Sequence, residues 1–335
     1  MAVTSEGLEK FEDMVVRAAE TTAKHVKAAK QEIGAVIFGQ EKVVEQALIT
    51  VLCGGHALLV GLPGLAKTKL VDTMGIVLGL DARRIQFTPD LMPSDIVGSE
   101  VMEEGVGGKR SFRFIPGPIF CQLLMADEIN RASPRTQSAL LQAMQEQHVT
   151  YAGNRHDVPR PFHVLATQNP IEQEGTYPLP EAQLDRFLMQ IDVDYPDLEN
   201  ERKIVFDTTG TEESKPKPTM TAEDLLSAQR LVRRLPVGES VVEAILSIVR
   251  SARPGPESGE LGQLISWGPS PRASQALMLV VRAKALLDGR LSPSVDDVME
   301  MAEPILKHRM ALTFAARAGG ETTEGVIGKL KTRIG

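Results

Sequence analysis

The stretch Gly61-Leu62-Pro63-Gly64-Leu65-Ala66-Lys67-Thr68 decides the fold. The apolar run 56–60 in front of it predicts a buried strand, and apolar residues at helical spacing from Leu70 to Leu78 predict a helix behind it. A strand, a glycine-containing loop and a helix that opens with Lys-Thr are the context of a phosphate-binding loop, whose backbone N–H groups converge on an anion. We therefore predict a nucleotide site in which Lys67 reaches the outer phosphates and the Thr68 hydroxyl ligates magnesium.

One position departs from the usual motif, because Ala66 stands where a second glycine is expected. A methyl group is a small steric addition, and Gly64 still relaxes the loop. Taken alone, the stretch also fits an ordinary strand-to-helix turn. The interpretation as a nucleotide site therefore depends on the residues that follow downstream.

The composition is that of an ordinary globular protein, and the length favours two domains. The chain has 335 residues, of which 42% are hydrophobic and 24% are charged. A net charge of −7 argues against a broad nucleic-acid footprint. No apolar run has the length of a membrane span, and the acidic N-terminus is unlike a secretory signal. We expect a cytoplasmic protein without membrane insertion.

Neither the cysteines nor the histidines indicate a metal site. Cys53 and Cys121 have no metal-binding spacing, and we expect both to be buried small hydrophobes without structural disulfides. The six histidines show no paired spacing either, which favours ordinary core or surface positions.

The order of the predicted elements divides the chain. Strands that alternate with helices up to residue 194, followed by helices only, predict a parallel α/β domain and a small all-α domain. The predicted units are an N-terminal helix (1–33), the α/β core (34–194), a linker (195–220) and a helical domain (221–335). Inside the core, we predict one hairpin around Gly107-Gly108 and another around Gly153-Asn154.

A pair of carboxylates follows the third predicted strand. The apolar run 123–126 ends in Asp127-Glu128. Beside a phosphate-binding loop, Asp127 can hold magnesium and Glu128 can orient and polarise the attacking water. The alternative is a solvated acidic pair that opens a loop, and the phosphate-binding loop upstream favours the site.

Three further polar residues could act on the phosphates. Asn169 follows the predicted strand 162–166 and could contact the γ-phosphate or the water, although a turn before Pro170 is the simpler interpretation of the residue alone. Arg186 could be an arginine finger or a surface arginine near a helix end. Arg272 lies in the first turn of a predicted helix, where a cation opposes the helix dipole, and a bound phosphate would explain it.

The assembled motifs resemble the MoxR family of AAA+ ATPases. The resemblance is carried by the phosphate-binding loop and by Ala-Asp-Glu-Ile-Asn-Arg-Ala-Ser-Pro-Arg-Thr-Gln-Ser-Ala-Leu-Leu-Gln-Ala-Met-Gln-Glu (126–146), its most specific part. Ala-Thr-Gln-Asn-Pro (166–170) and Leu-Pro-Glu-Ala-Gln-Leu-Asp-Arg-Phe (179–187) add to it. It covers residues 34–310, and Ala66 is at home in this family. It implies a P-loop NTPase core followed by a helical lid.

Carried over by position, the resemblance assigns roles to single residues. It implies that Lys67 and Thr68 belong to Walker A, Asp127 and Glu128 to Walker B, Asn169 to sensor 1, Arg186 to a finger on a neighbour's ATP, and Arg272 to sensor 2. The segments 93–118 and 148–160 match the helix-2 insert and the hairpin before sensor 1. The residues expected around ATP are Ile37, Gly39 and Gln40 at the adenine, and Gly61, Pro63, Gly64, Leu65, Ala66, Lys67, Thr68 and Lys69 at the phosphates.

The resemblance also implies a function and partners. We expect a Mg-ATP-hydrolysing, hexameric, chaperone-like motor that matures or remodels client proteins, with an adaptor that bears a von Willebrand factor A domain. One alternative is a nucleic-acid motor, and a second is a nucleotide-switched scaffold with little turnover. The sequence leaves open whether Arg272 acts on its own or a neighbour's nucleotide and whether Arg131 and Arg135 reach an interface. The cations that could line a nucleic-acid path are Lys109, Arg110, Arg113, Arg155 and Arg160.

Overall fold

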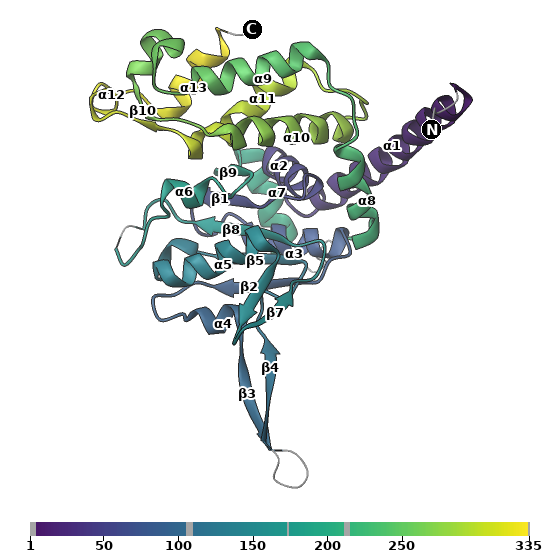
Figure 1. Ribbon diagram of the computed structural model, residues 1–335, viewed down its shortest axis with the longest axis vertical. Helices are drawn as coiled ribbons and strands as arrows, with labels where there is room; N and C mark the ends of the chain where they lie inside the picture. Colours follow the sequence, from purple (N-terminus) through teal and green to yellow (C-terminus); the bar gives the residue numbers. More distant parts are fainter. Residues whose placement is uncertain (1–4, 105–109, 173, 211–214, 334–335) are drawn as a thin grey trace.

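The computed structural model describes residues 5–104, 110–172, 174–210 and 215–333. Its centre is a five-stranded parallel sheet in the order β2-β5-β8-β1-β9 (Figure 1). The strands span Ala57–Gly61 (β1), Ala82–Gln86 (β2), Leu123–Asp127 (β5), His163–Gln168 (β8) and Met189–Val193 (β9). This parallel sheet with a helical domain behind it confirms the predicted fold class.

The central strands are buried on both faces, as their continuous apolar sequences require. Successive side chains of a strand point to opposite faces, so Leu58 joins one apolar core while Leu59 joins the other. The first core lies under α2 (Glu41–Leu52) and α3 (Lys67–Val77). The second lies under α4 (Pro93–Val97) and α5 (Pro134–Glu146). Helices therefore cover both faces of the sheet.

The helical domain shares the core on the α2 and α3 face, and so does α1 (Ser5–Gly34). An ion-pair cluster joins these parts: Lys284 donates to Glu45 Oε1 at 2.6 Å, and Lys30 pairs with the other oxygen of the same carboxylate. The helices of this domain span Ala222–Val232 (α8), Glu239–Ser251 (α9), Pro271–Leu287 (α10), Val295–Leu306 (α11), Phe314–Ala318 (α12) and Thr323–Lys331 (α13).

The helical domain is not purely helical. β10 (Ile265–Trp267) pairs antiparallel with β11 (Ala311–Leu312), and 3-10 turns lie at Pro256–Gln263 and Lys307–Arg309. Strands of two or three residues leave no alternating pattern, which explains why the sequence predicted helices only.

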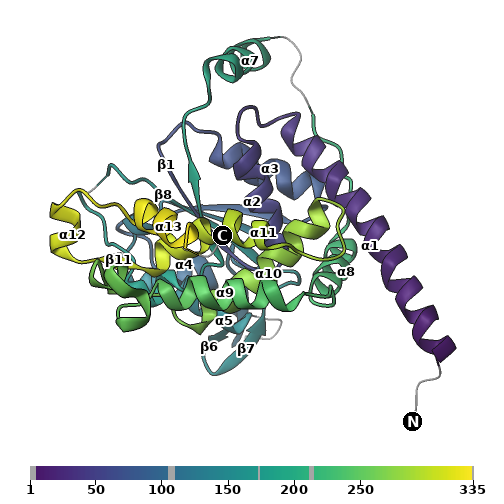
Figure 2. The same cartoon turned by 90° about the horizontal axis from the view of Figure 1, so that it is seen from above.

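The segment 195–220, predicted as a linker, contains a helix. α7 (Leu198–Thr209) begins at Asp197, whose side chain accepts from the backbone N–H of Asn200 at 2.8 Å. It has no buried residue, and Figure 2 shows it standing apart from the body of the molecule. Because its apolar side chains face no core, the sequence carries no stripe that would have marked the helix. The helix expected near 181–187 is likewise reduced to α6 (Glu181–Leu184).

Two hairpins leave the core. β3 (Gly98–Glu104) and β4 (Arg110–Pro116) form an antiparallel ribbon that projects from the body at the bottom of Figure 1. The short helix α4 precedes it in a stretch whose sequence predicts no helix. The predicted turn at Gly107-Gly108 lies outside the described residues. The second hairpin is β6 (His148–Tyr151) with β7 (Asn154–Asp157). A 3-10 turn, Ile129–Arg131, links β5 to α5.

Both cysteines are buried, as the sequence predicts. Burial raises the pKa of both thiols, that of Cys121 to about 12, so they act as apolar side chains. Within the described ranges, no helix is both long and apolar enough to cross a membrane.

Candidate active site

The phosphate-binding loop connects β1 to α3 with the backbone that the motif requires. A Cβ atom at Gly61 would lie 2.4 Å from the carbonyl oxygen of Val193, so only glycine fits where β1 passes β9. Gly64 has φ +84°, and Ala66, just before α3, has φ 56° and ψ 19°. Ala66 thus adopts the left-handed conformation of a glycine, at a cost of about 1 kcal/mol. The loop keeps its shape in spite of the substitution.

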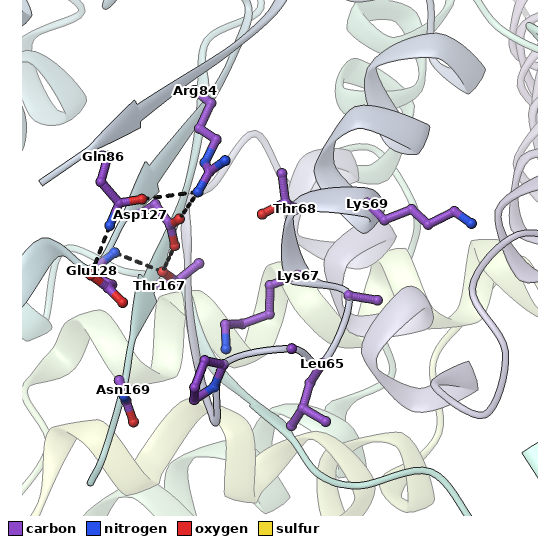
Figure 3. A pocket seen from close by; sticks show the side chains of 13 residues that line it. Leu65, Lys67, Thr68, Lys69, Arg84, Gln86, Asp127, Glu128, Thr167 and Asn169 are labelled. Carbon is purple, nitrogen blue, oxygen red and sulfur yellow. Dashed lines mark hydrogen bonds and ion pairs between the residues drawn. The ribbon is translucent and has the colours of Figure 1, made fainter. Parts of the chain in front are cut away.

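The loop forms one wall of a cavity of about 460 Å³ at the carboxyl ends of the strands (Figure 3). Parallel strands bring their carboxyl ends to one edge, which is why residues from four separate segments meet there. The lining residues are Pro63, Gly64, Leu65, Ala66, Lys67, Thr68, Lys69, Arg84, Gln86, Asp127, Glu128, Thr167 and Asn169.

Lys67 is turned back onto the loop. Its Nζ donates to the carbonyl oxygens of Gly61 at 2.8 Å and Leu62 at 2.6 Å. Burial lowers the pKa of Lys67, while the nearby carboxylates of Asp127 and Glu128 act in the opposite direction. The lysine and two acidic groups therefore share one electrostatic environment, although their motifs lie far apart in the chain.

The Asp127 carboxylate is held by two hydrogen bonds. Thr167 Oγ1 donates to Oδ1 at 2.5 Å, and Arg84 Nη2 donates to Oδ2 at 2.6 Å. These contacts follow from strand order, since Ala126 pairs with Ala166 and Gln86 pairs with Asp127 across the sheet. Both bonds fix the orientation of the carboxylate toward the cavity.

Glu128 is held in a strained backbone conformation with φ 55° and ψ 50°. Its N–H donates to Thr167 Oγ1 at 2.9 Å, and its Oε2 accepts from Gln86 Nε2 at 2.8 Å and from Arg131 Nη1 at 3.1 Å. A left-handed conformation in a non-glycine residue costs about 1–3 kcal/mol and clusters at functional sites. The strained backbone and the three hydrogen bonds together fix the direction of the Glu128 side chain.

Asn169 lies in the cavity wall and also forms a turn. Its Oδ1 accepts from the N–H of Ile171 at 3.2 Å, and its Nδ2 donates to Glu172 Oε2 at 3.5 Å. Both interpretations of this asparagine therefore fit its position.

A smaller cavity of about 110 Å³ adjoins the loop. Ile37 and Gln40, which belong to the segment predicted to contact adenine, line it, and Gln40 Nε2 donates to the carbonyl oxygen of Asp194 at 2.7 Å. Gly39 does not line it; its φ of +69° turns the chain beside Asn200. Ile204 and Thr208 of α7 complete the wall. The sequence missed both, because their segment was interpreted as a linker.

Arg186 and Arg272 lie outside both of these cavities. Both line a third cavity of about 290 Å³ with Asp185 and Arg309, and neither lines the cavity that holds Lys67. The Arg272 side chain is 53% exposed, and its Nη1 lies 4.0 Å from Asp185 Oδ2. Arg186 and Arg272, to which the resemblance assigns separate roles, thus line the same cavity.

The structure also places the two arginines that the sequence left open. Arg131 pairs with Glu128 and Glu172 within the same chain, whereas Arg135 is exposed in the first turn of α5. The sequence missed Arg84, Gln86 and Thr167. For Arg84 and Gln86 a signal exists, since they alternate on one side of a short strand that ends near the site.

Comparisons with known proteins agree with this architecture. The family model described as "ATPase family associated with various cellular activities (AAA)" matches residues 56–189, and that of the "AAA lid domain" matches residues 262–329. The chain is 42% identical over 302 residues to Chaperone MoxR1 of Mycobacterium tuberculosis, covering 89% of this chain and 79% of the relative. It is 31% identical to Protein MoxR of Paracoccus denitrificans, covering 86% and 88% of the two chains.

A solved structure shares the whole fold. The crystal structure of a candidate ATPase from Cytophaga hutchinsonii matches with a TM-score of 0.88 at 36% identity, over 98% of each chain. The similarity to these relatives thus extends over most of the length of each chain. The chain belongs to the MoxR family of AAA+ ATPases.

Proposed function

We propose that this ATPase is a Mg-ATP-dependent, chaperone-like motor that remodels or matures partner proteins. The observation that carries the proposal is the meeting of Lys67, Asp127 and Glu128 in one cavity of about 460 Å³. The size falls within the usual range for small-molecule sites, about 300–1,000 Å³. The chaperone role is supported by the similarity to Chaperone MoxR1.

The side chains in the cavity fit a nucleotide with magnesium. The Thr68 hydroxyl and the Asp127 carboxylate supply oxygen ligands of the kind that Mg²⁺ prefers. Lys67 and the backbone N–H groups of the loop would bind the phosphates. A bound magnesium ion would neutralise negative charge on the phosphate oxygens.

Glu128 would orient and polarise the attacking water as a general base. Its Oε2 accepts from Gln86 and Arg131, and the other carboxylate oxygen, Oε1, would accept from the water. Asn169 would contact the terminal phosphate or that water. Ile37, Gly39 and Gln40 would surround the adenine.

Arg186 and Arg272 would act on the nucleotide of a neighbouring subunit. The two line a cavity separate from the one that holds Lys67, which favours the neighbour for both. This division requires an assembly in which the phosphate cavity of one subunit faces the arginine cavity of the next. A closed ring with head-to-tail interfaces, hexameric as in other AAA+ ATPases, meets that requirement.

The β3–β4 hairpin is our candidate for client contact. Met102 and Phe112 pair across the ribbon and are 52% and 70% exposed, and Val101 and Ile115 are exposed as well. Exposed apolar side chains on a projecting ribbon mark a protein-binding surface rather than a stable solvent-facing one. An adaptor with a von Willebrand factor A domain, which the family resemblance implies, would bring the client to it.

The nucleic-acid alternative finds little support in the hairpins. Arg113 Nε lies 2.8 Å from Glu103 Oε1, and Arg155 Nε donates to Asp157 Oδ1 at 2.8 Å. Two of the five candidate cations are thus neutralised within their own hairpins, whereas a phosphate path needs uncompensated positive charge.

The test is capture of partners by Glu128→Gln held in ATP, with and without nuclease, followed by mass spectrometry. We expect a protein client or adaptor that remains bound after nuclease treatment. The control variant Met102→Ser/Phe112→Ser should keep ATP turnover and lose the captured protein. Capture that vanishes with nuclease would instead support the nucleic-acid motor.

A further inference from the structure

Arg309 is a buried cation outside the phosphate cavity. It lies in the 3-10 turn after α11, is 2% exposed, and has all five guanidinium N–H groups satisfied. One bond, from Nη1 to the carbonyl oxygen of Ile305 at 2.7 Å, stays within the lid. The other four reach the turn that carries Arg186.

These four bonds lie on both sides of Arg186. Arg309 Nε donates to Asp185 Oδ1 at 2.7 Å, and Nη2 donates to the carbonyl oxygens of Asp185 at 3.4 Å and Phe187 at 2.6 Å. Nη1 donates to the carbonyl oxygen of Leu188 at 3.0 Å. The lid thus fixes the backbone on either side of Arg186 by hydrogen bonds from a single side chain. Within the described chain, the Arg186 side chain itself forms no hydrogen bond or ion pair, so its direction depends on that backbone.

The same carboxylate connects to Arg272. Ser270 Oγ donates to Asp185 Oδ2 at 3.1 Å and accepts from the backbone N–H of Arg272 at 3.2 Å, as the N-cap of α10. Asp185 therefore bridges Arg309 to the helix end that carries Arg272. Arg186 and Arg272 are thus attached to two ends of one hydrogen-bond network centred on the buried Arg309.

We propose that Arg309 is a positioning residue that joins Arg186 and Arg272 into one rigid unit, presented by the lid to the nucleotide of the neighbouring subunit. This inference rests on the proposed action of both arginines on a neighbour's nucleotide. The network makes the lid part of the active site of the next subunit, because a movement of the 3-10 turn after α11 displaces the backbone around Arg186.

The first test is Arg309→Gln, with Arg309→Lys as the conservative variant. Neither side chain can reproduce the five bonds, so we expect ATP turnover to fall by about 10- to 100-fold, as for a misplaced catalytic group. The affinity of the variant for a fluorescent ATP analogue should stay within about twofold of wild type, since its own phosphate cavity is intact. Arg290→Gln is the matched control: Arg290 is a lid arginine bound to Asp297 at 2.7 Å, away from this network.

The second test mixes Arg309→Gln with Lys67→Ala. The first variant keeps a working phosphate cavity, and the second keeps properly held arginines. At equal amounts, random rings should recover about a quarter of the wild-type rate, because half of the subunits keep the cavity and half of those face a Lys67→Ala neighbour. A role in lid stability alone would give no such rescue.

Ser270→Ala keeps the test decisive if Arg309→Gln fails to fold. It removes one hydroxyl from the network, and Ser294→Ala, which removes the N-cap of α11 without touching Asp185, is its control. Turnover should fall for Ser270→Ala and not for Ser294→Ala. Equal turnover in the two, or an Arg309 variant that no mixture rescues while Arg186→Ala is rescued, would overturn the inference. If Arg186→Ala is not rescued either, the proposed action between subunits fails instead.

Discussion

Arg84 Nη2 donates to Asp127 Oδ2 at 2.6 Å, so the carboxylate expected to hold magnesium is already paired with a cation from the adjacent strand. The Arg84 side chain is 49% exposed and that of Asp127 only 13%. A magnesium ion bound through the same oxygen would compete with this guanidinium for the carboxylate.

We predict that Arg84→Met lowers the magnesium concentration needed for half-maximal ATP turnover. A half-exposed ion pair contributes up to about 1 kcal/mol, so the shift should be about two- to fivefold. Titrating magnesium at saturating ATP measures it. Arg83→Met is the control, because Arg83 lies on the same strand and pairs with Asp81. A higher magnesium requirement in Arg84→Met would mean that Arg84 assists the metal site.

Glu128→Gln should bind ATP and hydrolyse it about 10²- to 10⁴-fold more slowly, since an amide cannot accept the proton of the water. Single-turnover hydrolysis and direct nucleotide binding separate the two effects. The control is Glu146→Gln, which removes a carboxylate that pairs with Gln142 and His148 and does not line the cavity. Wild-type turnover by Glu128→Gln would remove this residue from the mechanism. Undetectable turnover by the assembled wild type would favour the scaffold alternative.

Stability should fall as the pH drops below about 6.5, the ordinary pKa of histidine. Burial lowers the pKa of His56 to about 3 and that of His163 to about 4, so both stay neutral when folded and take up protons only on unfolding. The unfolded chain then binds more protons, and each histidine should remove about 1.4 kcal/mol per pH unit between pH 6.5 and its folded pKa.

Urea unfolding at pH 7.5 and pH 5.5 measures this loss. Carboxylates with lowered pKa values, such as Glu45, lose their contribution only near pH 4 and below, so they leave this window clear. In His163→Gln the free energy of unfolding should fall less between the two pH values, because one titrating group is gone. The same free energy of unfolding at both pH values would contradict the buried neutral state of these rings.

The sequence predicts the phosphate cavity better than its surroundings. Lys67, Asp127 and Asn169 could be brought together in advance, because each follows a strand and parallel strands end at one edge. The alternation of Arg84 and Gln86 places both on one side of a strand, but their contacts with Asp127 and Glu128 depend on β2 lying next to β5, and strand order is a tertiary property. The proximity of Arg186 and Arg272 depends on how the lid packs against the α/β core, and no local sequence pattern specifies that packing.

The sequence did not predict helix α7, and the reason is a different one. Asp197 caps this helix, but Leu198, Val205 and Phe206 are 82%, 54% and 70% exposed, so the helix has no buried apolar stripe. Most helices are recognised by the face that they bury, and this one buries none. One of its sides lines the small cavity beside the loop, which links it to the expected adenine site.

The central claim is that each active site is shared between two subunits. The most direct measurement is ATP turnover across mixtures of Arg186→Ala and Lys67→Ala. Lys67→Ala should lose binding by about 10- to 100-fold, as for a charged hydrogen-bond donor, and Arg186→Ala should bind ATP but turn over at least about 100-fold more slowly. We predict that equal mixtures recover about a quarter of the wild-type rate, peaking near equal amounts. Turnover that stays at the level of the two single variants at every ratio would contradict the claim.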